Sequence, residues 1–210
     1  PMTSAHPNRL VYAITLGLLA ALGPLCIDLY LPALPELARD LHTQTSTAQL
    51  SLTAGLLGLG AGQLLFGPMS DKFGRIRPLL LSLLLLFIAS VGCALAKDIH
   101  SLLIARLFEG LAGAGGAVLS RAIARDMYSG HELTRFFALL MLVNGLAPVG
   151  APVLGGALMT IMSWRGIFLV LAAIAILLIL LARWQLHETL PPARRSQGSL
   201  FSAWAALGQV

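Results

Sequence analysis

Six long apolar blocks constrain this chain more than any other feature of its sequence. They lie at about residues 10–31, 48–68, 79–96, 102–124, 136–161 and 166–183. Each block is close to the roughly 20 apolar residues that cross the hydrocarbon core of a bilayer as a helix. Because backbone polar groups in lipid must be hydrogen bonded within the protein, we expect these blocks to be helical. The sequence therefore predicts an all-α integral membrane protein with a bundle of six transmembrane helices.

The distribution of charge predicts the orientation of this bundle. If the N-terminus is inside, ten basic residues fall on the inner side: Arg9, Lys72, Arg75, Arg77, Arg121, Arg125, Arg135, Arg183, Arg194 and Arg195. Four fall on the outer side or just within it: Arg39, Lys97, Arg106 and Arg165. This excess matches the positive-inside rule, so both ends of the segment are expected to be cytoplasmic. The net charge of +5 is then a consequence of topology, and we expect no nucleic-acid partner.

The expected organisation has three parts. Residues 1–9 form a cytoplasmic N-terminus, residues 10–187 the six-helix bundle, and residues 188–210 the start of a cytoplasmic linker that leads into an interfacial helix. The first and fourth blocks carry unusual residues, as do the second and fifth, whereas the third and sixth are almost wholly aliphatic. That correspondence predicts a pair of three-helix inverted repeats.

Charged side chains within the blocks are candidates for a proton pathway. Asp28 is the sole charged residue of the first block, and Arg106 lies at a similar depth in the fourth. Since a lone charge in a membrane is costly, we expect the two to meet across a cavity, with Asp28 exchanging a proton. Alternatively, Asp28 faces water and Arg106 extends towards the interface. Glu109 shares a helix face with Arg106 and either neutralises it, which we favour, or carries a proton itself.

The fifth block has an unusual density of helix-perturbing residues. They are Asn144, Gly145, Pro148, Pro152, Gly155 and Gly156. Prolines remove amide donors and glycines let a neighbour approach closely, so the pattern predicts either a packing kink or a hinge. We favour the hinge because so many of these residues occur together.

Catalytic and metal-binding patterns are missing from the sequence. The histidines are scattered without metal-ligand spacing, and both cysteines lie in apolar blocks. No P-loop, HExxH or GxSxG motif occurs. We therefore expect no enzyme activity, no metal and no cofactor other than a proton gradient.

The loop between the second and third blocks contains residues that the positive-inside rule does not explain. Residues 67–77 read GPMSDKFGRIR, and their basic residues follow from the positive-inside rule. Gly67 with Pro68 is expected to end the second helix, and Gly74 suits a tight turn. Asp71 would then be free to approach Arg75 or Arg125. We interpret these residues as a cytoplasmic gate.

Four segments resemble one family of transporters. Residues 67–77 resemble the loop signature of the major facilitator superfamily, and residues 151–156 (APVLGG) the fifth-helix signature of its drug/proton antiporters, with alanine at 151 in place of glycine. Residues 27–35 and 121–126 are similar to the Bcr/CflA drug-resistance branch, and the latter segment adds Asp126 to the gate. Glu109 departs from that branch, which usually has glutamine there.

The resemblance implies a twelve-helix protein in which this chain is the N-terminal half. We expect a fragment rather than half of a dimer, because the chain ends within its linker. The implied activity is proton-coupled export of hydrophobic drugs or small metabolites across a bacterial inner membrane. A nutrient or solute symporter of the same fold and a non-transporting membrane protein are the alternatives. The identity of the substrate cannot be read from half of the transport path.

Overall fold

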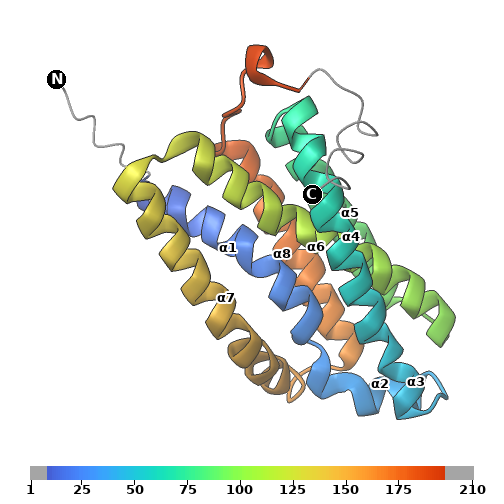
Figure 1. The fold of residues 1–210 in the computed structure, drawn as a ribbon. Coiled ribbons are helices and arrows are strands. Elements are labelled where there is room, and N and C mark those ends of the chain that lie inside the picture. The colour runs from blue at the N-terminus through green and yellow to red at the C-terminus, as the bar shows by residue number, and fades with distance from the viewer. Residues whose placement is uncertain (1–8, 197–210) are drawn as a thin grey trace.

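The computed structural model describes residues 9–196 and places six long helices in one bundle (Figure 1). They are α1 (Arg9–Asp28), α4 (Leu50–Phe73), α5 (Ile76–Ala94), α6 (Ile99–Met127), α7 (Gly130–Leu158) and α8 (Trp164–Gln185). The connection between α1 and α4 contains η1 (Leu31–Ala33), α2 (Leu34–Asp40) and α3 (Thr45–Ala48), and η2 (Pro192–Arg194) follows α8. All six are long and apolar enough to cross a membrane, which confirms the six predicted spans. Residues 1–8 of the predicted N-terminus and residues 197–210 of the predicted linker and interfacial helix lie outside the described residues.

The end of α4 differs from the sequence prediction. The helix does not stop at Gly67 and Pro68 but continues through both to Phe73. A proline removes one amide donor, which a long membrane helix tolerates when other groups satisfy the backbone. The chain turns at Gly74 instead, whose φ of +89° suits glycine and whose amide donates to the carbonyl of Ser70 at 3.0 Å. We call the end of the bundle with this turn, near Lys72, the basic end.

The helix α6 begins before its apolar block because a polar side chain caps its first turn. At the start of α6 the carboxylate of Asp98 accepts a hydrogen bond from the backbone amide of Ser101 at 2.7 Å. This N-cap places the first helical residue at Ile99, three positions before the predicted block. Hydropathy locates the apolar part of α6, whereas this cap determines where the helix begins.

The packing of the helices has the symmetry expected of two repeats. α4 packs against α6, and α1 correspondingly packs against α7; α5 contacts α6, and α8 contacts α1. The symmetry exchanges α1 with α6, α4 with α7 and α5 with α8. Two further contacts, α1 with α6 and α5 with α8, are therefore each unchanged by it. This pattern is consistent with the predicted pair of three-helix repeats.

Glycines set the shortest distances between the helices. A Cβ atom on Gly58 of α4 would overlap the carbonyl of Leu107 in α6, and one on Gly110 of α6 would overlap the carbonyl of Gly55. In the symmetry-related contact, a Cβ on Gly155 of α7 would overlap a carbonyl at the end of α1. These backbones therefore pack in direct contact, as small residues allow in membrane helices.

Two apolar clusters fill the interior. One lies towards the basic end and includes Leu19, Phe66 and Leu83; the other lies towards the opposite end and includes Tyr30 and Trp164. The indole of Trp164 donates to Asp40 at 2.8 Å, which ties α8 to α2. Both clusters are packed around α6, the most enclosed of the long helices.

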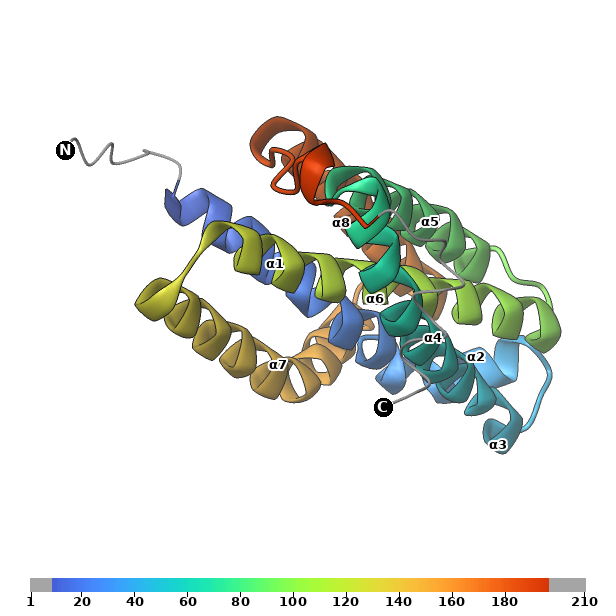
Figure 2. The same ribbon diagram turned by 45° about the horizontal axis from the view of Figure 1, so that its top comes forward.

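One long helix has a largely uncovered surface. Only 11% of the most apolar window of α7 is buried, against 61% for α6. Figures 1 and 2 show α7 beside α1, on the other side of the bundle from α4 and α5. The packing thus places α6 inside the bundle and α7 at its edge.

We expect the substitution Gly58→Ala to destabilise the bundle. Its Cβ would clash with the backbone of α6, and forced overpacking typically costs about 1–3 kcal/mol. Gly60→Ala is the matched control on the same helix, because no atom lies within 4 Å of its Cβ position. Thermal unfolding of the full-length protein in detergent should show a lower Tm for Gly58→Ala alone. Equal Tm values for the two variants would contradict the close contact.

Candidate functional site

Arg75 is the centre of a charge cluster at the basic end. Its side chain is buried, with 7% of the residue exposed. Nη1 donates to Asp71 at 2.8 Å and to the hydroxyl of Ser70 at 2.7 Å. Nε and Nη2 donate to the two carboxylate oxygens of Asp126 at 2.8 and 3.1 Å. A single guanidinium group therefore joins the ends of α4, α5 and α6.

The electrostatics of this cluster favour its charged form. Burial lowers the pKa of Arg75, but its hydrogen bonds to Asp126 and Asp71 outweigh that effect and raise the pKa above its usual value. The paired bonds to Asp126 need the planar, forked geometry of a guanidinium, which a lysine ammonium lacks. Arg75 is thus a permanent cation shared by two acids.

The structure brings together three of the six predicted gate residues, namely Asp71, Arg75 and Asp126. Gly74 supplies the turn that precedes Arg75. Gly67 lies within α4, where its carbonyl accepts a hydrogen bond from the Ser70 hydroxyl at 2.9 Å. Arg125 is exposed, and no hydrogen bond of the described residues connects it to the cluster. Of the two partners considered for Asp71, the structure selects Arg75.

Residues that follow α8 also contact this cluster, and sequence reasoning missed them. The Thr189 hydroxyl donates to Asp126 at 2.7 Å. The Glu188 carboxylate accepts hydrogen bonds from the backbone amides of Arg75 at 2.8 Å and Ile76 at 3.2 Å. Between 63 and 113 residues separate these partners, and the segment around Glu188 has no helical periodicity that could have placed it.

A second charged group lies inside the bundle. Arg106 and Glu109 of α6 are both fully buried and form an ion pair. Nη1 of Arg106 also donates to the backbone carbonyl of Cys26, and Nε donates to that of Ser51 at 3.2 Å. The other carboxylate oxygen of Glu109 accepts a hydrogen bond from Ser90 at 3.0 Å. Four helices, α1, α4, α5 and α6, therefore share one buried pair of charges.

The shape of the bundle accommodates the guanidinium of Arg106. Its central carbon lies 4.3 Å from the centre of the Tyr30 ring, in cation–π geometry. On the α4 side, a Cβ at Gly55 would come within 2.5 Å of Nη2. Nη2 itself has no hydrogen-bond partner among the described residues. Gly55 therefore leaves the space that the buried cation occupies.

Asp28 is the last residue of α1 and is partly buried. It lies two residues after Cys26, whose carbonyl contacts Arg106, so the two charges are at similar depth. Within residues 9–196, however, no hydrogen bond or ion pair joins Asp28 to another group; Arg106 acts on it only through space. The structure thus pairs Arg106 with Glu109 and leaves Asp28 without a direct partner.

The six helix-perturbing residues predicted in the fifth block all lie within the uninterrupted helix α7. Asn144, Gly145 and Pro148 are exposed, and Pro152 and Gly156 are partly exposed. Gly155 is buried against α1. Of these residues, Gly155 has a packing role in the bundle, while most of the others lie on the uncovered surface of α7.

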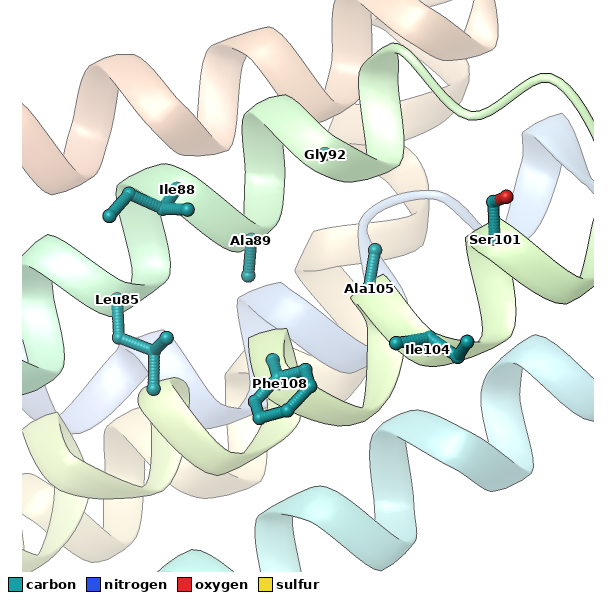
Figure 3. A pocket seen from close by; sticks show the side chains of 8 residues that line it. All are labelled: Leu85, Ile88, Ala89, Gly92, Ser101, Ile104, Ala105 and Phe108. Atoms are coloured by element: carbon teal, nitrogen blue, oxygen red, sulfur yellow. The ribbon is translucent and has the colours of Figure 1, made fainter.

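An apolar groove of about 500 Å³ lies between α5 and α6 (Figure 3). Leu85, Ile88, Ala89 and Gly92 line it from α5, and Ser101, Ile104, Ala105 and Phe108 from α6. Ser101 supplies the one polar side chain of this lining. None of the predicted site residues lines the groove, although Phe108 is adjacent to Glu109 in the chain.

Residues that often bind metals are dispersed. Cys26 and Cys93 are buried free thiols on different helices. Within the described ranges, no three His, Cys, Asp or Glu side chains gather in a way that could hold a metal ion. Four of the acids in this part of the chain instead pair with arginines, namely Asp71, Glu109, Asp126 and Glu188.

Comparisons with known proteins agree on one family. Residues 16–208 match the family model described as Major Facilitator Superfamily. The chain is 47% identical to an uncharacterized MFS-type transporter of Bacillus subtilis, over 97% of this chain and 51% of that protein. It is 32% identical to a bicyclomycin resistance protein homolog of Haemophilus influenzae, over 87% of this chain and 46% of that protein. It is also 32% identical to multidrug resistance protein D of Escherichia coli, over 85% and 45%.

A comparison with solved structures finds a similar fold in another transporter. The human organic anion transporter MFSD10 matches with a TM-score of 0.65 at 23% identity, over 91% of this chain and 50% of that one. The chain spans about half the length of the curated relatives it matches. The Bacillus subtilis relative and the human protein are both named as transporters.

The buried pair yields a prediction about stability. Glu109→Leu leaves an uncompensated cation inside the bundle, and breaking a buried ion pair typically costs about 3–5 kcal/mol. Arg106→Met leaves the opposite charge. The double variant removes both charges, so it should unfold at a higher temperature than either single variant. Tm values of the full-length protein test this, and simple addition of the two single effects would contradict the pairing.

Proposed function

Because the chain belongs to the major facilitator superfamily, we propose that it is the N-terminal half of a proton-coupled antiporter that works by alternating access. It would export hydrophobic drugs or small metabolites across a bacterial inner membrane. Proteins named for bicyclomycin and multidrug resistance are among its relatives, which supports export of drug-like molecules. The excess of basic residues near the α4–α5 turn supports a cytoplasmic location for the basic end and for both ends of this segment.

The observation that carries the proton-coupling proposal is the pairing of Arg106 with Glu109. Glu109 is therefore already paired with Arg106. The other acid of the apolar blocks, Asp28, is partly exposed and has no direct partner among the described residues. A carboxylate in such a position can take up and release a proton as its access alternates between the two sides. Arg106 then acts on Asp28 electrostatically from a fixed position.

The missing half of the protein would complete the transport path. The uncovered surface of α7, with its prolines and glycines, is where we expect that half to pack and the bundle to bend. At the basic end, Asp71 is 58% exposed although it binds Arg75. An acid in that position is available to the N-terminus of a helix from the other half. We therefore assign the Asp71, Arg75 and Asp126 cluster to a gate that opens and closes as the halves move.

Asp28→Asn should abolish proton-coupled efflux. The amide cannot exchange a proton at physiological pH, so export of a dye such as ethidium by cells with the full-length protein should fall to background. Glu36→Gln, in the short helix α2, is the matched control for loss of one acid. Efflux at the wild-type rate in Asp28→Asn would refute the proton role. Uptake rather than export with an inward proton gradient would identify the symporter alternative.

Asp71→Ala should reduce transport at normal expression, by about tenfold if one charged hydrogen bond of the gate is lost. Arg77→Ala, in the first turn of α5, is the nearby control, because its side chain is exposed and makes no hydrogen bond with the described residues. The measurement is the initial efflux rate per molecule of transporter in the membrane. A wild-type rate for Asp71→Ala would exclude this residue from the gate.

A further inference from the structure

The chain does not leave the bundle after α8. Residues 186–196, which we call the strap, turn back over the basic end, and Figures 1 and 2 show this red segment near the ends of α4 and α5. Leu186 and Leu190 of the strap are buried, with Leu186 in the same apolar cluster as Leu83. The strap is therefore anchored by apolar contacts as well as by polar ones.

Glu188 caps the start of α5. The first amides of an α-helix have no partner within the helix, and Arg75, in the N-cap position, provides no side-chain cap. The Glu188 carboxylate accepts hydrogen bonds from the amides of Arg75 and Ile76, and a third from Leu190 at 3.1 Å within the strap. A negative charge there also interacts favourably with the helix dipole. The cap thus comes from the far end of the described chain.

The ionisation of Glu188 suits this role. Burial raises its pKa, but the backbone hydrogen bonds from Arg75, Leu190 and Ile76 outweigh that effect and lower the pKa below the usual value of a glutamate. Arg195 lies 3.9 Å away and acts in the same direction. The carboxylate is therefore ionised at neutral pH.

Gly74 connects the loop signature with the strap. A Cβ at this position would lie 2.7 Å from the Glu188 carboxylate and 2.8 Å from the guanidinium of Arg195. The positive φ is what favours glycine at this position, and the ends of two strap side chains lie in the space beside it. This proximity of the strap cannot be seen in the loop sequence alone.

The strap also contacts the other two helix ends of the cluster. Thr189 donates to the same Asp126 oxygen that accepts from Nε of Arg75. The amide of Ser196 donates to the backbone carbonyl of Asp71 at 2.7 Å. Each member of the Asp71, Arg75 and Asp126 cluster therefore has a hydrogen bond from or to the strap.

We propose that the strap is a fourth element of the gate, in which Glu188 and Thr189 are positioning residues for Arg75 and Asp126. The proposal rests on the assignment of that cluster as a gate. Since the strap continues directly from α8, a movement of the end of α8 relative to α5 would remove the cap from Arg75 and one donor from Asp126. The contacts of the gate would then depend on the position of α8 and of the strap.

Hydrogen–deuterium exchange of the full-length protein in nanodiscs tests the contacts. Glu188→Ala should accelerate exchange of the amides of Arg75 and Ile76 by about tenfold or more, since each loses a charged acceptor. Glu188→Gln keeps one neutral acceptor and should give a smaller increase. Arg194→Ala, an exposed strap residue without a side-chain hydrogen bond among the described residues, is the matched control. Unchanged exchange in Glu188→Ala would overturn the cap.

Transport by the same variants tests the functional role. Glu188→Ala and Thr189→Val should lower the maximal efflux rate at unchanged dye affinity, because neither residue is placed at the buried charge site. Faster exchange with a wild-type efflux rate would overturn the strap as part of the gate. If Asp71→Ala also transports at the wild-type rate, the gate assignment itself fails; if only the strap variants are unimpaired, the strap proposal alone fails.

Discussion

The bundle depends on the burial of one cation, the guanidinium of Arg106. A charge inside a membrane protein is costly unless it is paired and its hydrogen bonds are satisfied. Glu109 provides the counter-charge, and carbonyls of α1 and α4 provide further acceptors. The α4 carbonyl, that of Ser51, is within reach because Gly55 and Gly110 allow α4 and α6 to pack with their backbones in contact. The close packing of the helices and the buried ion pair therefore depend on one another.

The basic end uses a second arginine in a different way. Arg75 lies outside the apolar interior and binds two acids from two helices. One of these acids, Asp71, stays largely exposed. Such a cluster can separate without leaving charges in hydrocarbon, which the Arg106 pair cannot do. In the proposed function the contacts that move are therefore those at the basic end, and the fixed ones are those around Arg106. The strap proposal extends the moving contacts to α8.

The sequence predicts the number of spans because hydropathy depends on local composition. It also predicts that Asp71 approaches Arg75 or Arg125, and the structure selects Arg75. It does not predict that α4 continues through Pro68, because a proline in a membrane helix weakens one hydrogen bond without ending the helix. The sequence leaves the partner of Arg106 open between Asp28 and Glu109, since a residue at similar depth and one on the same helix face both satisfy the pattern. Glu188 and Ser90 carry no local signal, because their partners lie on other helices.

The division of roles between the two acids of the spans is the central claim, and difference infrared spectroscopy of the full-length protein tests it directly. A change of pH should produce a carboxyl band that disappears in Asp28→Asn and persists in Glu109→Gln. That result would mean that Asp28 exchanges the proton while Glu109 remains the ionised partner of Arg106. A band that disappears in Glu109→Gln and persists in Asp28→Asn would contradict this claim.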